Sequence, residues 1–252
     1  MLLLPAQPFG SKSSPEAALP TRLQTLSVAH RCTPSPRTNE TMIRATTTLR
    51  RTFSAWPLTT PRTVSLIGAP QQFGQPRGGV ENAPQLLRKA GLAETVANLD
   101  WRVNDEGDVD METTQDVAGP LRHAAQIGHG SQKLMEACLA AHARGNFVLT
   151  LGGDHSVALG TVSAALQARP STKVLWVDAH ADCNSPSTSP SGNAHGMPLA
   201  FLLKLVQSSE LGAASSAFAW LDDVRLAPQN LAFVGLRDVD AEERKILLRL
   251  RE

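Results

Sequence analysis

Short apolar runs alternate with amphipathic segments from about residue 63 to the end of the chain. The runs are rich in β-branched and aromatic residues and are bounded by Gly, Pro or Asp, which is typical of strands. These predicted strands span 63–70, 147–153, 173–178 and 231–236. The segments with helical spacing span 83–99, 130–144, 156–168, 197–206 and 241–252. Because the runs are apolar throughout, we expect the strands to be buried on both faces.

Strands and helices in alternation predict an α/β domain with a parallel sheet and right-handed crossovers. We expect one such domain over residues 63–252, without an internal repeat or a second folded domain. In folds of this kind the functional site lies at the carboxyl ends of the strands. The polar residues that follow each predicted strand are therefore the first candidates for chemistry.

Residues 1–62 differ in composition from the rest. They carry eight basic residues against Glu16 and Glu40, a balance of +6, and many Ser, Thr and Pro. This composition predicts an unstructured leader rather than a domain. The stretch from Met42, MIRATTTLRRTFSAWPLTTPRT, has four Arg and no acid, as mitochondrial and plastid transit peptides do. We predict a mitochondrial protein, or a cytoplasmic one if the leader is an inert tail; Met42 is an alternative start.

The remaining 190 residues carry 16 basic and 21 acidic residues, a balance of −5. An acidic body gives no electrostatic reason to expect nucleic acid as a partner. No apolar run approaches the roughly 18 to 20 residues that a membrane helix needs. Three widely spaced cysteines indicate reduced thiols and an intracellular compartment.

The stretch LWVDAHADCN, residues 175–184, places acids and a histidine at every second position after a predicted strand. If the chain stays extended there, Asp178, His180 and Asp182 point to one side, because side chains alternate along a strand. Carboxylate and imidazole ligands without thiolates favour manganese, iron or zinc. The alternative is an acid cluster that caps a following helix, although crowded carboxylates repel unless a cation neutralises them.

A second strand end carries similar residues. In LTLGGDHSVALG, Asp154 and His155 lie between a predicted strand and a predicted helix, with Ser156 as the expected helix cap. Asp and His are common at helix starts, so this turn alone is moderate support for a ligand. Two strand ends that both carry Asp and His favour a shared metal site.

The chain resembles the arginases, of the manganese-dependent ureohydrolase family. Three stretches carry the resemblance: GGDHS (152–156), DAHAD with its extension CNSPSTSPSGNAHGMP (178–198), and GLRDVDAEE (235–243). A fourth, IGAPQQFGQPRGGVENAP (67–84), opens the domain as in arginases. The SGNxHGxP and RDVD stretches resemble arginases rather than agmatinases. The resemblance runs from about residue 63 to the end and implies a three-layer α/β fold with a mostly parallel central sheet, as in arginases and deacetylases.

The resemblance also implies a role for each matching residue. His155 would bind one Mn²⁺ and His180 a second, with Asp178 bridging both and Asp182 completing the first. The substrate residues would be Asn184, Ser191 and Asn193 for the α-carboxylate and Asp240 and Glu243 for the α-amino group. His195 would be the proton shuttle.

Five of these substrate-binding and catalytic residues also have an ordinary structural reading. His195 can be a surface histidine, and Ser191 and Asn193 are common turn formers. Asp240 and Glu243 have the spacing of a capping box before the last helix, and the two roles can coexist.

The implied reaction is the manganese-dependent hydrolysis of L-arginine to L-ornithine and urea, as in the urea cycle. The guanidinium carbon is a poor electrophile, so attack needs a water activated by two metal ions, and departure of the amine needs a proton from a histidine. The resemblance further implies a homo-oligomer, since arginases are commonly trimers.

The chain departs from the arginase pattern in one respect. Arginases carry, after the RDVD stretch, an SxDxDxxDP motif with two metal-binding aspartates and a later Glu that holds the guanidinium, and this sequence ends at Glu252 before them. We therefore expect a sheet that is incomplete on its C-terminal side, with an open edge and uncovered apolar faces. The hypothesis is a truncated arginase of weak or no activity. The alternatives are a non-catalytic arginase-like polypeptide and, more weakly, an agmatinase, which has no need of the loop NSPSTSPSGN.

Overall fold

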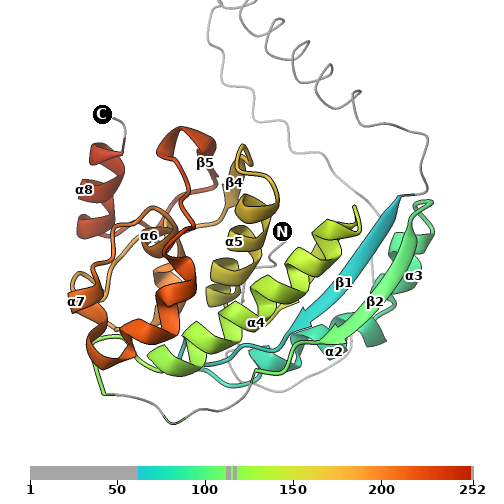
Figure 1. The fold of residues 1–252 in the computed structure, drawn as a ribbon, viewed down its shortest axis with the longest axis horizontal. Helices are drawn as coiled ribbons and strands as arrows, with labels where there is room; N and C mark the ends of the chain where they lie inside the picture. Colours follow the sequence, from blue (N-terminus) through green and yellow to red (C-terminus); the bar gives the residue numbers. More distant parts are fainter. Residues whose placement is uncertain (1–61, 112–114, 116–117, 251–252) are drawn as a thin grey trace, which may run out of the picture. The chain divides into compact units, whose positions relative to one another are not determined.

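The computed structural model describes residues 62–250 except 112–114 and 116–117 (Figure 1). The predicted leader therefore lies, except for Arg62, outside the described residues. No helix within the described part of the chain is long and apolar enough to cross a membrane.

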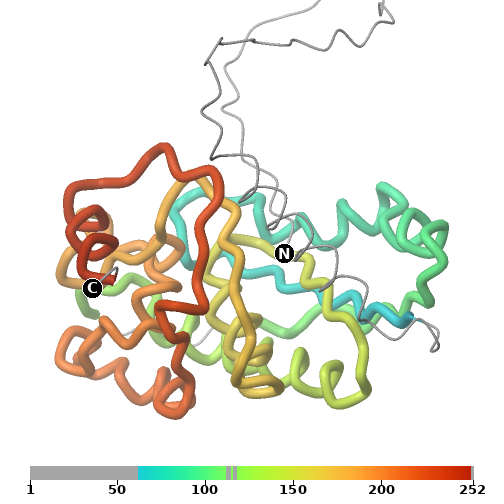
Figure 2. Tube along the Cα trace, turned by 90° about the horizontal axis from the view of Figure 1, so that it is seen from above, coloured from blue at the N-terminus to red at the C-terminus, as the bar shows by residue number. Residues whose placement is uncertain are grey.

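Five strands form two parallel sheets. The four predicted strands are confirmed with small changes at their ends, as β1 (Thr63–Ala69), β3 (Phe147–Gly152), β4 (Val174–Val177) and β5 (Leu231–Val234). β1 lies between β2 and β3 in one sheet, and β4 pairs with β5 in the other. Figure 2 shows β5, in red, running beside β4. The predicted α/β class with parallel strands is confirmed.

β2 (Arg102–Asp108) was not predicted, because its sequence RVNDEGD has no apolar run. It is an edge strand with mostly exposed side chains. Ion pairs, rather than a buried apolar face, attach it to the rest of the domain. Arg88 donates to Asp105 at 2.8 Å and also pairs with Asp108. The hydrogen bond from Arg88, outweighing burial, holds the pKa of the Asp105 carboxyl below its usual value.

The helices lie in the connections between strands, except for α8, which follows β5. In chain order they are η1 (Val80–Asn82), α2 (Ala83–Lys89), α3 (Leu92–Ala97), α4 (Ala124–Ala143), η2 (His155–Val157), α5 (Ala158–Ala168), η3 (Ala194–Gly196), α6 (Pro198–Leu202), α7 (Ser208–Leu211), η4 (Gly212–Leu221), η5 (Pro228–Asn230) and α8 (Ala241–Arg249). The single helix predicted over 83–99 is wrong, because Gly91 at φ +83° breaks it into two. Neither α7 nor η4 was predicted.

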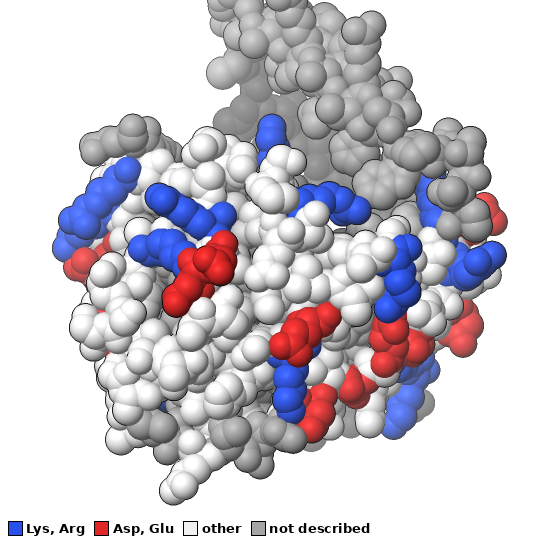
Figure 3. All heavy atoms as spheres, in the orientation of Figure 1, with Lys and Arg blue, Asp and Glu red and all other residues white. Residues whose placement is uncertain are grey.

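The larger sheet has helices on both faces, with α4 on one and α2 and α3 on the other (Figure 1). α4 packs along α5, and the main apolar cluster joins these two helices to α6, η4 and Trp176 of β4. The face drawn in Figure 3 mixes acidic and basic side chains and shows no continuous basic patch. β3 of the larger sheet and β4 of the smaller sheet each end in a loop at the carboxyl edge of their sheet.

Burial on both faces is confirmed only for β1, in which six of seven residues are buried. It is wrong for β3, β4 and β5, which contain together just two buried residues, Leu151 and Trp176. Each of these three strands has a neighbouring strand on one side only within the described residues. The neighbouring pairs Leu175–Ala232 and Val177–Val234 present an exposed apolar face. This exposure agrees with the expected open edge and uncovered faces.

We expect the double variant Leu175→Thr, Val234→Thr to bind less of the dye ANS and to scatter less light on concentration, because it removes exposed apolar surface. Its free energy of unfolding should change by only about 0.5 kcal/mol, since Leu175 is 63% and Val234 49% exposed. The buried Trp176→Ala variant is the contrast and should lose about 3 to 5 kcal/mol. Unchanged dye binding by the double variant would contradict this assignment of the exposed face.

The last helix, α8, packs on the main cluster through Ile246, Leu247 and Leu250. Leu248 faces solvent and is 62% exposed. A hollow of about 390 Å³ separates β5 from α8 and is lined by Pro228, Leu231, Phe233, Leu236, Leu247 and Leu250. The side chains that line it are all apolar, so none of them offers a group for catalysis.

Candidate metal centre

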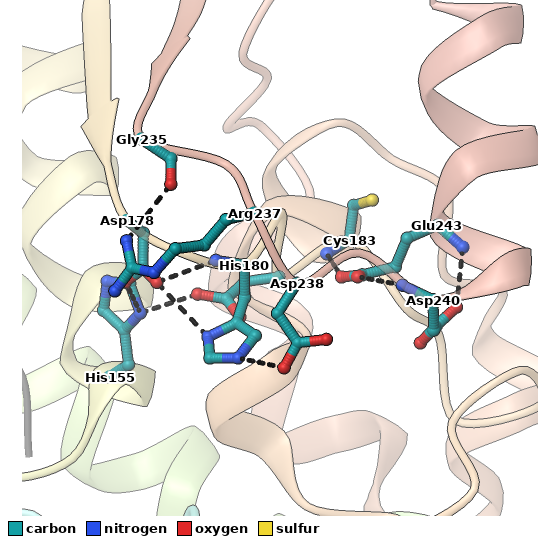
Figure 4. A network of polar contacts seen from close by, with 10 residues as sticks. His155, Asp178, His180, Cys183, Gly235, Arg237, Asp238, Asp240 and Glu243 are labelled. Atoms are coloured by element: carbon teal, nitrogen blue, oxygen red, sulfur yellow. Dashed lines mark hydrogen bonds and ion pairs between the residues drawn. The ribbon is translucent and has the colours of Figure 1, made fainter. Parts of the chain in front are cut away.

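The candidate site lies where β3, β4 and β5 end, as expected for a parallel α/β fold. β3 leads to His155, β4 leads directly to Asp178, and β5 leads to the loop that carries Asp238 (Figure 4). Backbone hydrogen bonds hold the last two loops together, since Asp178 N–H donates to Val234 O and both Arg237 and Asp238 donate to Ala179 O. Residues far apart in the sequence therefore meet at one edge.

Three of the four predicted ligands form one compact group. His155 Nδ1 lies 3.4 Å from Asp178 Oδ2 and 2.6 Å from Asp182 Oδ2. The three candidate ligand atoms all lie within 4.8 Å of one another. The group is sheltered, with Asp182 buried and the other two side chains partly buried.

The path of the chain through this group differs from the predicted one. β4 ends at Val177, and the chain does not continue as an extended strand to Asp182. Asp182 has φ +48°, a left-handed conformation that is uncommon for a residue other than glycine. The prediction that alternation along a strand brings the three side chains together is thus wrong. A tight turn brings Asp182 back to Asp178 and leaves His180 on the outer side.

His180 faces the opposite oxygen of Asp178. Its Nδ1 lies 3.3 Å from Asp178 Oδ1, whereas Oδ2 of the same carboxylate faces His155. The His180 side chain is 53% exposed and does not belong to the compact group. Asp178 therefore presents one oxygen to each histidine, although Oδ1 also accepts from the His180 backbone N–H at 2.9 Å, and this arrangement suits a carboxylate that bridges two cations.

The donor set fits a divalent cation. Asp182 Oδ2 is buried and has no hydrogen-bond partner, although His155 Nδ1 lies 2.6 Å away, because the two atoms lack hydrogen-bond geometry. Such an unsatisfied buried carboxylate oxygen is costly unless a cation compensates it. The His155 ring stacks on Trp176 with centroids 4.6 Å apart, which orients its Nδ1 toward the carboxylates. Oxygen and imidazole ligands together suit manganese, iron or zinc.

Asp238 is a candidate that the sequence analysis missed. Its Oδ2 lies 3.3 Å from His180 Nε2, on the side of the ring away from Asp178 (Figure 4). Carboxylates in this position commonly hold the ring of a metal-binding histidine and fix which nitrogen carries the proton. The first Asp of the RDVD stretch was the available signal, but only the loop contacts show that it reaches His180.

Three of the five predicted substrate-binding residues, Asn184, Asp240 and Glu243, are linked by hydrogen bonds. Asn184 Nδ2 donates to Asp240 Oδ2 at 2.6 Å, and Asn184 Oδ1 accepts from Thr188. Glu243 is buried, and its oxygens accept from the backbone N–H groups of Cys183 and Asp240. Burial, opposed by these two hydrogen bonds, raises the pKa of the Glu243 carboxyl. Asp240 is exposed and is the member of this set best placed to meet a ligand.

Asp240 and Glu243 also form the capping box of α8 that their spacing suggested. The Asp240 side chain accepts from the N–H groups of Glu242 and Glu243, and the Glu243 side chain accepts from the Asp240 N–H. Burial raises the pKa of Asp240, but the hydrogen bonds from Glu243, Asn184 and Glu242 outweigh it and leave the pKa below its usual value. The capping role is therefore established for these residues.

We expect Asp240→Ala to lower the free energy of unfolding by about 1 kcal/mol, because an N-cap side chain is lost. Asp240→Asn is the matched variant and should retain most of the stability, since asparagine caps helices about as well as aspartate. Urea denaturation measures both. Equal losses in the two variants would show that the cap contributes nothing.

Ser191 and Asn193 lie together further along the loop that begins after β4 and also carries Asn184. Asn193 N–H donates to Ser191 Oγ at 3.3 Å, and Arg122 N–H holds the loop through Gly192 O at 2.9 Å. Gly192 has φ +68°, and a Cβ there would lie 2.5 Å from Pro120 O. These contacts agree with the turn reading of Ser191 and Asn193, and no hydrogen bond joins either residue to Asn184 or Asp240.

His195 is the middle residue of η3, directly after this loop, and is held from one side. Its backbone N–H and its Nδ1 both lie against Gly74 O, at 2.9 and 2.7 Å. Since a carbonyl oxygen only accepts, Nδ1 carries the proton in this contact and Nε2 is the second ring nitrogen left for exchange. His195 is accordingly fixed in the fold and is not a loose surface histidine.

Two residues beside the candidate ligands, Ser156 and Cys183, can be compared with what the sequence predicts for them. Ser156 is not the helix cap; Asp154 is, since its side chain accepts from Ser156 N–H at the start of η2. Cys183 is fully buried, and burial followed by repulsion from Glu243 raises the pKa of its thiol to about 12. A protonated thiol is a poor metal ligand, which agrees with a site built from oxygen and imidazole.

Comparison with known proteins finds arginases among the chain's relatives. The hepatic arginase of Aquarana catesbeiana is 41% identical over 194 residues, which are 75% of this chain and 58% of that protein. The solved arginase of Bacillus caldovelox has a TM-score of 0.68 at 32% identity, over 75% of this chain and 63% of that one. The arginase of Entamoeba histolytica, solved in complex with L-ornithine, has a TM-score of 0.66 at 28% identity and covers 75% of this chain and 62% of that one.

The chain thus spans less than two thirds of the length of each of these relatives. The profile of the arginase family matches residues 62–251, a range that includes all ten predicted site residues. With its parallel α/β fold and its relatives at about 40% identity, this match establishes that the chain belongs to the arginase family.

Proposed function

We propose that this chain carries the metal-binding half of an arginase site and acts in the manganese-dependent hydrolysis of L-arginine to L-ornithine and urea. The observation that carries the proposal is Asp178, whose two oxygens face two different histidines at 3.4 and 3.3 Å. A carboxylate in that position can hold two cations at once, and two-metal sites hydrolyse bonds that water alone attacks slowly.

His155 and Asp182 would complete the first cation's ligands, and His180 would belong to the second. Two Mn²⁺ ions bound in this way would supply an activated water for attack on the guanidinium carbon. Burial of the Asp182 carboxylate and stacking of His155 on Trp176 fix the positions of these two ligands.

The polar groups beside the metal centre support an α-amino acid as substrate. Exposed Asp240 would accept the α-ammonium group, with Glu243 holding it from behind. Asn184, Ser191 and Asn193 would face the α-carboxylate, for which their amide and hydroxyl groups are suitable donors. His195 would give a proton from Nε2 to the leaving amine, because its Nδ1 is occupied by Gly74 O.

A second candidate is a metal-binding polypeptide without catalysis. It is favoured by the number of ligands, since only four metal-ligating side chains converge in the described residues and a fully formed manganese site takes about six ligands per ion. Such a chain would hold one ion in the group of His155, Asp178 and Asp182.

Manganese stoichiometry separates the two candidates. We expect isothermal titration of the full chain to give two Mn²⁺ ions per chain, and Mn²⁺ at about 100 times its Kd to stabilise the fold by about 2.7 kcal/mol. A stoichiometry of one would favour the second candidate. His155→Ala, which removes the ligand facing both aspartates, is the control and should abolish the stabilisation.

A further inference from the structure

The peptide segment at Gly74, in the loop after β1, is held from both sides by residues of other loops. Gly74 N–H donates to Asp154 Oδ2 at 2.8 Å. Gly74 O accepts from the backbone N–H of His195 at 2.9 Å and from its Nδ1 at 2.7 Å. A continuous path of short hydrogen bonds therefore runs from Asp154 through Gly74 to the imidazole of His195.

Asp154 is a suitable anchor for this path because it is buried and fully engaged. It is only 5% exposed, and its Oδ1 accepts from Ser156 N–H at 2.9 Å and Ser156 Oγ at 2.6 Å. The three hydrogen bonds of this side chain all come from donors, so the carboxylate acts as an acceptor throughout. Its position is also fixed through the backbone, since Asp154 N–H donates to Gln71 O at 2.8 Å.

The contact depends on glycine at position 74. A Cβ there would lie 2.3 Å from Asp154 Oδ1 and 2.9 Å from Ser156 Oγ, closer than nonbonded atoms approach. The preceding turn is as tight, since a Cβ at Gly153 would lie 1.9 Å from Gln71 O. Both glycines serve the same close approach between the loop after β1 and the turn after β3.

We propose that Asp154 is a positioning residue for His195, acting through the Gly74 segment. By holding Gly74 in place, Asp154 keeps Gly74 O against Nδ1, so that Nδ1 carries the proton of the neutral ring and Nε2 is the atom that exchanges protons. The catalytic meaning of this arrangement rests on the proposed function of His195. The arrangement itself rests only on the contacts of Asp154, Gly74 and His195.

Nitrogen NMR of the histidine ring tests the proposal without reference to activity. In the full 252-residue chain, prepared without Mn²⁺ because the paramagnetic ion broadens nearby signals, His195 should be in the Nδ1–H form. In Asp154→Asn one carboxylate oxygen becomes an NH₂ group, which faces either the Gly74 N–H or the two donors of Ser156 and cannot accept from them. The ratio of Nδ1–H to Nε2–H forms of His195 should then fall about fivefold, the factor for one neutral hydrogen bond.

Ser156→Ala is the matched control. It removes one hydrogen bond to Asp154 and leaves the Gly74 contact, so the His195 ratio should not change. An unchanged ratio in folded Asp154→Asn, or the same fall in both variants, would overturn the proposal. If Asp154→Asn does not fold, the test is the His195 tautomer in the unsubstituted chain. An Nε2–H ring there would contradict the proposal.

The outcome is separable from that of the proposed function. Absence of urea release from a chain whose His195 ratio responds to Asp154 would reject the hydrolase and keep the positioning role. Urea release from a chain whose His195 ratio ignores Asp154 would do the reverse.

Discussion

Replacement of Asp178 by asparagine is expected to weaken Mn²⁺ binding by more than about 100-fold and to abolish urea release. Loss of a residue that only supports a metal ligand costs about 10- to 100-fold in affinity, so loss of a ligand itself should cost more. Asp178 presents Oδ2 to His155 and Oδ1 to His180, and a carboxamide offers one oxygen and no charge. Both cation positions are therefore affected by one substitution.

Titration calorimetry with MnCl₂ measures the affinity, and circular dichroism verifies that the variant is folded. The exposed Asp222→Asn changes the net charge equally and should leave both affinity and urea release unaltered. Tight binding of two ions by Asp178→Asn would exclude a bridging role for this residue.

His195→Ala should lower kcat for L-arginine by about 10²- to 10⁴-fold, the usual contribution of a positioned proton donor. Manganese binding should not change, because Nδ1 of His195 is engaged by Gly74 O and the residue is not in the ligand group. Loss of turnover with intact metal binding is the pattern that distinguishes a proton shuttle from a ligand.

The exposed His129→Ala is the matched histidine control, with no expected effect on turnover. The comparison uses initial rates of urea release at saturating Mn²⁺. Full turnover in His195→Ala would assign the proton transfer elsewhere, and a parallel loss of metal binding would make His195 part of the metal centre.

The fold was predictable where hydrophobic pattern alone determines structure. All four apolar runs became parallel strands, because runs of β-branched and aromatic residues bounded by Gly, Pro or Asp favour strands. The polar strand β2 escaped prediction, since ion pairs such as Arg88–Asp105 support it and leave no periodic signal. Burial was predicted too widely for β4, whose Leu175 and Val177 lack covering partners in the described residues.

The site was predictable in its residues but not in its geometry. The motifs that resemble arginases identified His155, Asp178 and Asp182, and the structure brings these three together. The positive φ of Asp182 that achieves this cannot be read from alternation along a strand. The contact of Asp238 with His180 depends on loops 58 residues apart, which a sequence pattern does not connect.

Urea release from L-arginine by the purified, Mn²⁺-loaded full chain tests the central claim most directly. The account predicts weak release, because the set of metal ligands is small, that requires Mn²⁺ and disappears in His155→Ala, whose ring faces both Asp178 and Asp182. Protein that is soluble, folded and loaded with two Mn²⁺ ions but releases no urea would contradict it.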